Sequence, residues 1–285
     1  MAIAVGISRT SLYVQHTTQS SKDINSIQEL TIAHSHHPRY GARRLALYLG
    51  WSINKTRRIR CAANISAIRN SKKYHKYNSQ ASDIDVPINH LANYALFKDK
   101  HRPQAGITYS NMTSANAWAQ DFTYLRIRSG MYYLALVLNL ETREILSWKL
   151  GTNHSSSLTH IALIQALRTN TSPDILHSDR GSEYLSQRHA TTCIRFGIQI
   201  SASKPGSPWQ NGFMERCIKS VKEELGSLSQ YQDLDELYIG ITNAIAYYNN
   251  HRIHTALKMS PRDYAKSIKT RKFKLNSVFR KVGAV

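Results

Sequence analysis

Residues 117–150 have the sequence AWAQDFTYLRIRSGMYYLALVLNLETREILSWKL. Three runs within it, 117–127, 132–140 and 144–150, are rich in leucine, aromatic and β-branched side chains, a composition typical of strands. Short connections containing Arg128-Ser129-Gly130 and Glu141-Thr142-Arg143 join these runs. Because connections this short favour hairpins, we predict three consecutive antiparallel strands.

After these strands the chain alternates between helical and extended patterns. We predict, in chain order, a helix at 157–167, a strand at 174–177, a helix at 187–196, a strand at 198–201, and helices at 212–225 and 234–249. Three consecutive strands followed by alternating helices and strands predict a mixed five-stranded α/β sheet flanked by helices. That is the order of a ribonuclease-H-like fold, which we assign to residues 113–266.

The region before the sheet, residues 1–70, has the pattern of short helices. Apolar residues recur at helical spacing in 24–34 and 43–49, and a basic helix follows at 54–60. Helix, tight turn and basic helix are the order of a helix-turn-helix, so we predict a small all-helical DNA-binding region. The alternative is an ordinary basic surface in contact with solvent. The candidate DNA contacts here are Arg43, Arg44, Asn54, Lys55, Arg57 and Arg58.

Two further segments complete the predicted organisation. Residues 71–112 are polar and irregular, and we predict a linker with one short helix at 91–97. Residues 267–285 carry six basic and no acidic side chains and form a basic tail. This tail either contacts the DNA backbone or is disordered.

The charge of the chain favours a polyanionic partner. In 285 residues, 38 Lys and Arg oppose 18 Asp and Glu, which gives a formal charge of +20 and an isoelectric point near 10.0. A bias of this size most often serves nucleic-acid binding, and it argues against acidic partners and small neutral substrates. We therefore expect double-stranded DNA as the partner.

Cysteine usage and hydropathy indicate a cytoplasmic protein. The three cysteines form no CxxC pair, which excludes a disulfide framework and a Cys-based zinc module. His34, His36 and His37 have no matching Cys pair, so we expect a solvated loop there instead of a zinc site. The longest apolar run, 131–138, is far shorter than the roughly 20 residues of a membrane helix, and the N-terminus lacks a signal-peptide pattern.

Three carboxylates stand where a packed sheet does not need them for stability. Asp121 interrupts an aromatic and β-branched strand, Asp179 follows an apolar strand, and Glu215 lies one turn into a helix. Each alone is as well explained as a turn or a helix cap. Brought together, they cannot all stay ionised without a cation, and Mg²⁺ or Mn²⁺ prefers such oxygen ligands. A pair of these ions supports in-line phosphoryl displacement, the chemistry of nucleases and of strand transfer.

The helix that carries Glu215 offers a second feature. Glu215, Lys219 and Lys222 follow at i, i+4 and i+7 and so share a face, which would present a metal ligand and two ammonium groups to DNA phosphates. The alternative is an ordinary Glu–Lys surface pair, worth only about 0.2–0.5 kcal/mol. His177, beside Asp179, is expected to pack or to hydrogen-bond and not to act as a base.

Three ordered blocks carry a resemblance to a known family. They are WAQDFTY at 118–124, HSDRGSEY at 177–184 and SKPGSPWQNGFME at 203–215. With them the chain resembles the insertion-sequence-3 family of bacterial transposases, in particular the product of the second reading frame, whose core is similar to a retroviral integrase. YGARR at 40–44 is similar to the family's upstream helix-turn-helix, and YYNNHRIHTAL at 247–257 with Pro261 to its closing motif.

The resemblance implies a site and a reaction. It makes Asp121, Asp179 and Glu215 the catalytic ligands of two Mg²⁺ or Mn²⁺ ions, with the characteristic 35 residues between the last two. It places Asn211 and Lys219 beside them and adds Lys222 and Arg252 as DNA contacts. One departure is Asn139, where relatives often carry Asp, a position on which the metal site does not depend. The implied activity is strand cleavage at the ends of an insertion element and transfer of those ends to target DNA.

The resemblance also implies partners. Relatives act as multimers on DNA, so we expect a homo-oligomer on element ends and target, close to the bacterial nucleoid. In this family the active enzyme is commonly a fusion with an upstream reading frame, which supplies a further helix-turn-helix and a coiled coil. This chain shows neither of those at its start, so we expect that it needs such a fusion partner or is incomplete.

Two other functions remain open from the sequence. One is a catalytically inactive DNA-binding remnant that occupies element ends and competes with intact enzyme. The other is a ribonuclease-H-like nuclease without strand transfer, which would use the same three ligands. Carboxylate-dependent Mn²⁺ binding separates the first from a transposase, and joined DNA products separate the second.

Overall fold

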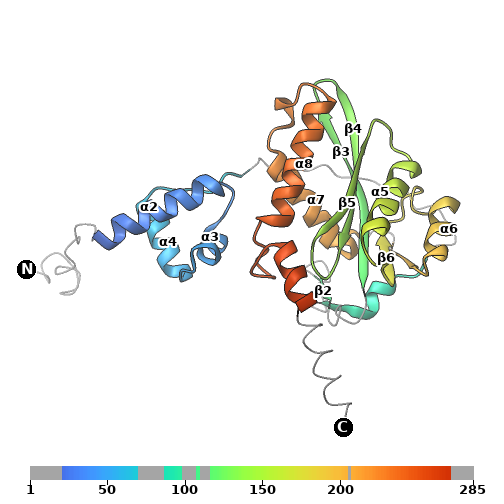
Figure 1. Ribbon diagram of the computed structural model, residues 1–285, viewed down its shortest axis with the longest axis horizontal. Helices are drawn as coiled ribbons and strands as arrows, with labels where there is room; N and C mark the ends of the chain where they lie inside the picture. The colour runs from blue at the N-terminus through green and yellow to red at the C-terminus, as the bar shows by residue number, and fades with distance from the viewer. Residues whose placement is uncertain (1–20, 70–86, 98–106, 110–115, 205–206, 271–285) are drawn as a thin grey trace, which may run out of the picture. The chain divides into compact units, whose positions relative to one another are not determined.

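The computed structural model describes residues 21–69, 87–97, 107–109, 116–204 and 207–270 (Figure 1). The chain divides into two compact units, one formed by residues 1–70 with 253–258 and the other by residues 71–252 with 259–285. Most of the predicted linker and the predicted tail beyond residue 270 lie outside the described residues. Each unit is described by itself below.

The described part of the first unit contains three helices, α2 (Ser21–His36), α3 (Ala42–Leu49) and α4 (Ile53–Ala62). Their apolar faces enclose Leu30, Leu45 and Ile59, each fully buried. Helix α3 ends at Gly50, whose backbone is left-handed at φ 66°, and α4 begins at Ser52, whose hydroxyl accepts the Lys55 N–H at 3.2 Å. The three predicted helices are therefore present. Their use as a helix-turn-helix stays a prediction.

The second unit is built on a five-stranded sheet of order β5-β4-β3-β6-β7. Strands β3 (Ala117–Ile127), β4 (Gly130–Asn139) and β5 (Ile145–Gly151) are antiparallel neighbours, as the short connections predict. Strands β6 (Ile175–Ser178) and β7 (Gln199–Ala202) continue the sheet in parallel with β3. The predicted mixed sheet of the ribonuclease-H-like type is confirmed.

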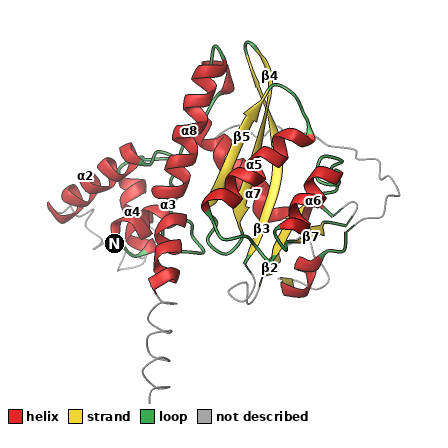
Figure 2. Ribbon diagram, turned by 45° about the vertical axis from the view of Figure 1, so that its right-hand side comes forward, coloured by secondary structure: helices red, strands yellow, loops and turns green. Residues whose placement is uncertain are grey.

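Helices cover both faces of this sheet (Figure 2). Alternating residues of β4 separate the two layers: Leu134, Leu136 and Leu138 belong to the core under α7 and α8, whereas Ala135 and Val137 belong to the core under α5 and α6. The bounds of these helices are α5 (Ser156–Thr169), α6 (Gln187–Arg195), α7 (Gly212–Leu225) and α8 (Leu234–Asn250). Short 3₁₀ turns, η4 (Pro208–Asn211) and η5 (Leu228–Gln230), stand before and after α7.

The segment before the sheet differs from prediction. The helix expected at 91–97 is a 3₁₀ turn, η2 (His90–Tyr94), followed by a short strand, β1 (Ala95–Phe97). Strand β1 pairs antiparallel with β2 (Ile107–Tyr109), which the sequence did not indicate. A seven-residue apolar run fits a helix or a strand equally well, and a partner strand ten residues away decides between them.

Two observations concern the rest of the described chain. Residues 261–270 are helical, so a helix crosses the predicted limit between core and tail at 266. Among the described residues, none of the helices combines the length and the apolar character that crossing a bilayer requires.

Candidate active site

Asp121 is placed by the alternation of β3. It lies on the same side of the strand as Ala117 and Ala119, which face α7 and α8. Its Oδ1 accepts the N–H of Phe122 at 2.8 Å. Burial, together with the negative charge of Asp179, raises the pKa of Asp121 well above its usual range, and Glu215 and Glu183 raise it further.

Asp179 follows the last residue of the neighbouring strand β6. Its Oδ1 accepts the Gly181 N–H at 3.0 Å, which closes a turn and fixes the carboxylate at the end of the strand. Burial raises the pKa of Asp179, and the charge of Glu183 adds to this, whereas His154 works against it. The first two predicted site residues therefore lie together, and the charge of Asp179 disfavours ionisation of Asp121.

Glu215 reaches the same region from the other direction. It lies in the first turn of α7, and the residue as a whole is exposed. Partial burial of its carboxyl raises its pKa, and its charge contributes to the raised pKa of Asp121. Across the described ranges, however, no three His, Cys, Asp or Glu side chains stand together as a ready-made metal site. The charges of Asp179 and Glu215 both raise the pKa of Asp121, so the three predicted site residues share one electrostatic environment.

Glu183 is a fourth carboxylate at this site, and the sequence reasoning missed it. Its side chain is 4% exposed, and Oε1 lies 3.4 Å from Nε2 of His154. A Cβ on Gly181 would stand only 2.5 Å from the Glu183 carboxyl carbon, so this glycine leaves the space that the carboxylate fills. The available signal was its place inside HSDRGSEY, the block that also supplies Asp179.

The two lysines of α7 differ in their surroundings. Lys222 is partly buried, and its Nζ lies 5.0 Å from the centre of the Tyr124 ring. Burial lowers the pKa of Lys222, while the charge of Asp121 raises it, which places this ammonium in the field of the first aspartate. Lys219 is exposed. Lys222 is therefore the lysine associated with the site.

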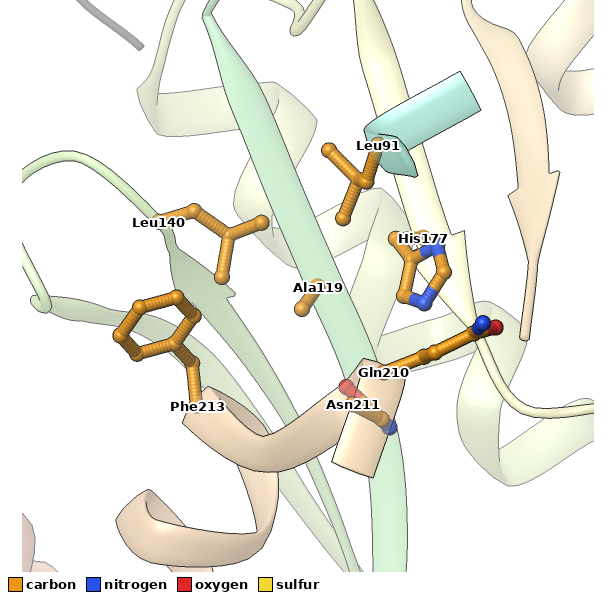
Figure 3. A pocket seen from close by; sticks show the side chains of 7 residues that line it. All are labelled: Leu91, Ala119, Leu140, His177, Gln210, Asn211 and Phe213. Carbon is orange, nitrogen blue, oxygen red and sulfur yellow. The ribbon is translucent and has the colours of Figure 1, made fainter. Parts of the chain in front are cut away.

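Two predicted DNA contacts are buried instead. Arg252 is 3% exposed, and its guanidinium pairs with Glu224 at 3.2 Å and Glu223 at 3.5 Å. The donors of Arg252 serve a packed ion pair inside the unit, and its contact with DNA remains an untested prediction. Asn211 is 6% exposed and lines a small pocket with His177 (Figure 3), so its side chain is largely shielded from solvent.

His177 has the structural role that was expected. It is fully buried, and its ring nitrogens bond to the hydroxyls of Ser201 at 2.9 Å and Ser203 at 3.0 Å. Burial lowers the pKa of His177 to about 4, so the ring is neutral at pH 7. It joins the end of β6 to the end of β7 beside Asp179.

In the first unit, the basic residues predicted to contact DNA are largely available. Asn54, Arg57 and Arg58 are exposed and follow at i, i+3 and i+4, so they share one face of α4. Arg58 also forms a two-bond ion pair with Asp23, one bond being 2.9 Å long. Lys55 lies beside this face, with its Nζ 3.9 Å from the centre of the Trp51 ring. The other two residues lie on α3. Arg43 is exposed, and the Arg44 guanidinium carbon lies 5.7 Å from the centre of the Tyr40 ring.

The histidine cluster is not the solvated loop that was expected. His34 and His36 belong to the last turn of α2. His37 is 7% exposed and stacks on Tyr40 with ring centres 4.5 Å apart. The ring of Tyr40, three residues further along the chain, and not a metal, explains why His37 is buried.

Asn139, where relatives often carry Asp, is a turn residue. Its Oδ1 accepts the N–H groups of Glu141 and Thr142, both at 2.9 Å, and so closes the turn between β4 and β5. A carboxylate would accept the same two bonds. The substitution is therefore neutral for the site.

Comparison with known proteins agrees with this arrangement. Two family models, both described as integrase core domain, match residues 113–208 and 196–261 and so span all three predicted ligands. The transposase for insertion sequence element IS904 of Lactococcus lactis is 29% identical over 258 residues, which cover 87% of this chain and 96% of that protein. The transposase for insertion sequence IS3A of Escherichia coli is 34% identical over 109 residues, 38% of each chain. The chain belongs to the insertion-sequence-3 family of transposases.

One more insertion-element protein and a solved structure are also similar to this chain. A 31 kDa protein of the insertion element IS600 of Shigella sonnei is 27% identical over 276 residues, which cover 90% of the transposase described here and 94% of that protein. Among solved structures, the catalytic core domain of HTLV-2 integrase, determined in complex with magnesium, has a TM-score of 0.45 at 20% identity. It covers 52% of the transposase and 95% of that domain.

Proposed function

We propose that Asp121, Asp179 and Glu215 are the catalytic residues of this DNA transposase and hold two divalent cations, Mg²⁺ or Mn²⁺. The observation that carries this proposal is the parallel pairing of β3 with β6, which brings together two buried aspartates whose pKa values are raised by burial and by neighbouring carboxylates. Such a concentration of negative charge is relieved by a cation with oxygen ligands. When bound, the two ions would supply activation of a water or a 3′-hydroxyl and stabilisation of the leaving oxygen in an in-line displacement.

The residues of the chain have separate tasks in this proposal. Asp121 and Asp179 supply the fixed ligands, since strand and turn hold both carboxylates. Glu215 supplies the third ligand from the first turn of α7. Lys222 holds an ammonium beside Asp121, where it orients a phosphate of the substrate strand.

The substrate and the partners follow from the same proposal. The transposase cleaves at the ends of its insertion element and joins the exposed 3′ ends to double-stranded target DNA in the cytoplasm, beside the nucleoid. Two ends must be held at once, which supports a homo-oligomer on DNA, completed where needed by the product of the upstream reading frame. The exposed face of α4 with Asn54, Arg57 and Arg58 supplies contacts to the element ends.

A cleavage and joining assay tests the proposal. Double-stranded oligonucleotides that carry an element end are incubated with the full chain and Mg²⁺ or Mn²⁺, and cleaved and joined products are separated on a gel. Asp121→Asn, Asp179→Asn and Glu215→Gln should each remove both products and leave DNA binding intact. The exposed Asp235→Asn serves as the matched control. An active Glu215→Gln variant would refute the assignment, and cleavage without joining would identify a nuclease.

A further inference from the structure

The residues just before the catalytic sheet contact the loop that leads to Glu215. We name residues 87–94 the strap. Its backbone meets β7 through the N–H of His90, which donates to Ser201 Oγ at 3.0 Å. Its Leu91 is 1% exposed and lies against Ala119 and Phe213 (Figure 3), in a pocket that leaves no space for a water molecule. The strap is therefore a packed part of the unit.

One side chain of the loop ties it to the strap. Gln210 Oε1 accepts two hydrogen bonds, from Asn89 Nδ2 at 2.8 Å and from the backbone N–H of Lys204 at 2.7 Å. The second bond closes the loop between β7 and α7 on itself, and the first anchors the closed loop to the strap. Gln210 stands directly before Asn211, the residue at which α7 begins.

The start of α7 is held on its other side as well. Phe213 packs towards Leu140 and Leu91 (Figure 3), and the Arg143 guanidinium lies 3.5 Å from the centre of its ring. Glu215 follows two residues later in the same turn. Because a helix propagates rigidly from its first turn, the position of this turn decides where the Glu215 carboxylate stands relative to the two aspartates.

We propose that Asn89, acting through Gln210, is a positioning residue for Glu215. The inference rests on the proposed function, because it assumes that Glu215 is a ligand. Asp121 and Asp179 need no such help, since their own strands fix them. Glu215 does, since it lies in the first turn of a helix that begins at the end of a loop. Groups that orient a metal ligand typically change metal affinity about 10- to 100-fold when removed.

Calorimetric titration of the full chain with Mn²⁺ tests this inference. Asn89→Ala and Gln210→Met, which break the bond from opposite sides, should each weaken Mn²⁺ binding by about 10-fold or more. Gln210→Glu keeps an oxygen that accepts from both partners and should retain most of the affinity. Asn93→Ala changes an exposed residue of the same strap and should match the wild type.

A double variant separates positioning from mere support of the fold. If Asn89 acts only through Glu215, Asn89→Ala combined with Glu215→Gln should bind Mn²⁺ no more weakly than Glu215→Gln alone. Additive losses, or unchanged affinity in both Asn89→Ala and Gln210→Met, would overturn the inference while the catalytic assignment stands. Unchanged affinity in Glu215→Gln would overturn both. Thermal unfolding of every variant is measured alongside, and Gln210→Met decides the question where Asn89→Ala does not fold.

Discussion

Asp121 and Asp179 each stand two residues past the same rung of the sheet, where Ala119 of β3 pairs with His177 of β6. Neighbouring strands lie about 4.8 Å apart, so equal offsets in a parallel pair bring the two carboxylates to one place. The effect of the Asp179 charge on the pKa of Asp121 is a direct consequence of this register. The sheet therefore sets two of the three proposed ligands before any metal or DNA is present.

Asp121→Asn is expected to stabilise the metal-free protein while it removes activity. The pKa of Asp121 is raised above its ordinary 3.8, so the folded state favours the protonated form. The stability that this preference contributes is present at low pH and is lost as the pH rises through the raised pKa. At pH 7 the ionised carboxylate therefore destabilises the fold, and the neutral amide removes that cost.

Thermal unfolding in EDTA at pH 7 measures this effect. We expect the Asp121→Asn midpoint to rise by about 2–4 °C, the shift that 1 kcal/mol produces in a domain of this size. Asp235→Asn, in the exposed first turn of α8, should stay within about 0.5 kcal/mol of the wild type. A lower unfolding midpoint for Asp121→Asn would mean that the ionised carboxylate does not destabilise the fold.

The strands show how much of the fold can be predicted from the sequence. The alternation in 117–150 predicts β3, β4 and β5 because each run pairs with its neighbour in the chain, and local turns fix the register. The carboxylate pair was predicted from chemistry, and its closeness depends on the parallel pairing of β3 with β6, which joins residues 58 positions apart. That distance along the chain carries no local signal.

Two features that the sequence does not indicate share one physical cause. Arg252 follows a run of polar and aromatic residues and gives no sign that Glu223 and Glu224 will surround it. Glu183 was overlooked because the turn after β6 brings it near Asp121. This turn is possible because Gly181 has no side chain where the Glu183 carboxylate lies. Both contacts are tertiary, so spacing in the sequence does not encode them.

His189 is expected to make the catalytic unit sensitive to acid. It is 1% exposed, its Nε2 lies 3.1 Å from Gln120 Oε1, and burial lowers its pKa to about 4 from the ordinary 6.5. Stability from a neutral buried imidazole is complete above pH 6.5 and is lost as the pH falls towards 4. The full effect is about 3 kcal/mol, at 1.36 kcal/mol for each pKa unit.

Urea unfolding at pH 7 and at pH 4.5 checks this sign. The wild type should lose more stability between these two conditions than His189→Gln, because the amide does not take up a proton. The exposed His251→Gln should keep the wild-type difference. Equal losses in wild type and His189→Gln would show that this imidazole is not held neutral.

Arg252→Met is expected to destabilise the protein without changing its affinity for DNA. The guanidinium is buried between two carboxylates, and its removal leaves Glu224, only 13% exposed, without its partner. We expect a loss of about 2 kcal/mol, less than the 3–5 kcal/mol of a fully buried pair because Glu223 is 35% exposed. Urea unfolding gives the loss, and a DNA titration at 0.1 M salt should give the wild-type dissociation constant. Weaker DNA binding by the folded variant would restore Arg252 as a contact.

Substitutions on the exposed face of α4 should separate the contribution of charge to DNA binding from the recognition of DNA sequence. Arg57→Ala removes one cation, so the slope of log K against log salt should become shallower by about 1 for any DNA sequence. Asn54→Ala removes no charge and should leave the slope unchanged, while it weakens discrimination between an element end and random DNA if the amide reads a base edge. Fluorescence anisotropy over 50–200 mM salt with both duplexes measures the two effects. Arg168→Ala, an exposed arginine on α5, is the matched control for charge and should keep the wild-type slope. A face that merely contacts solvent would give all three variants the slope and the discrimination of the wild type.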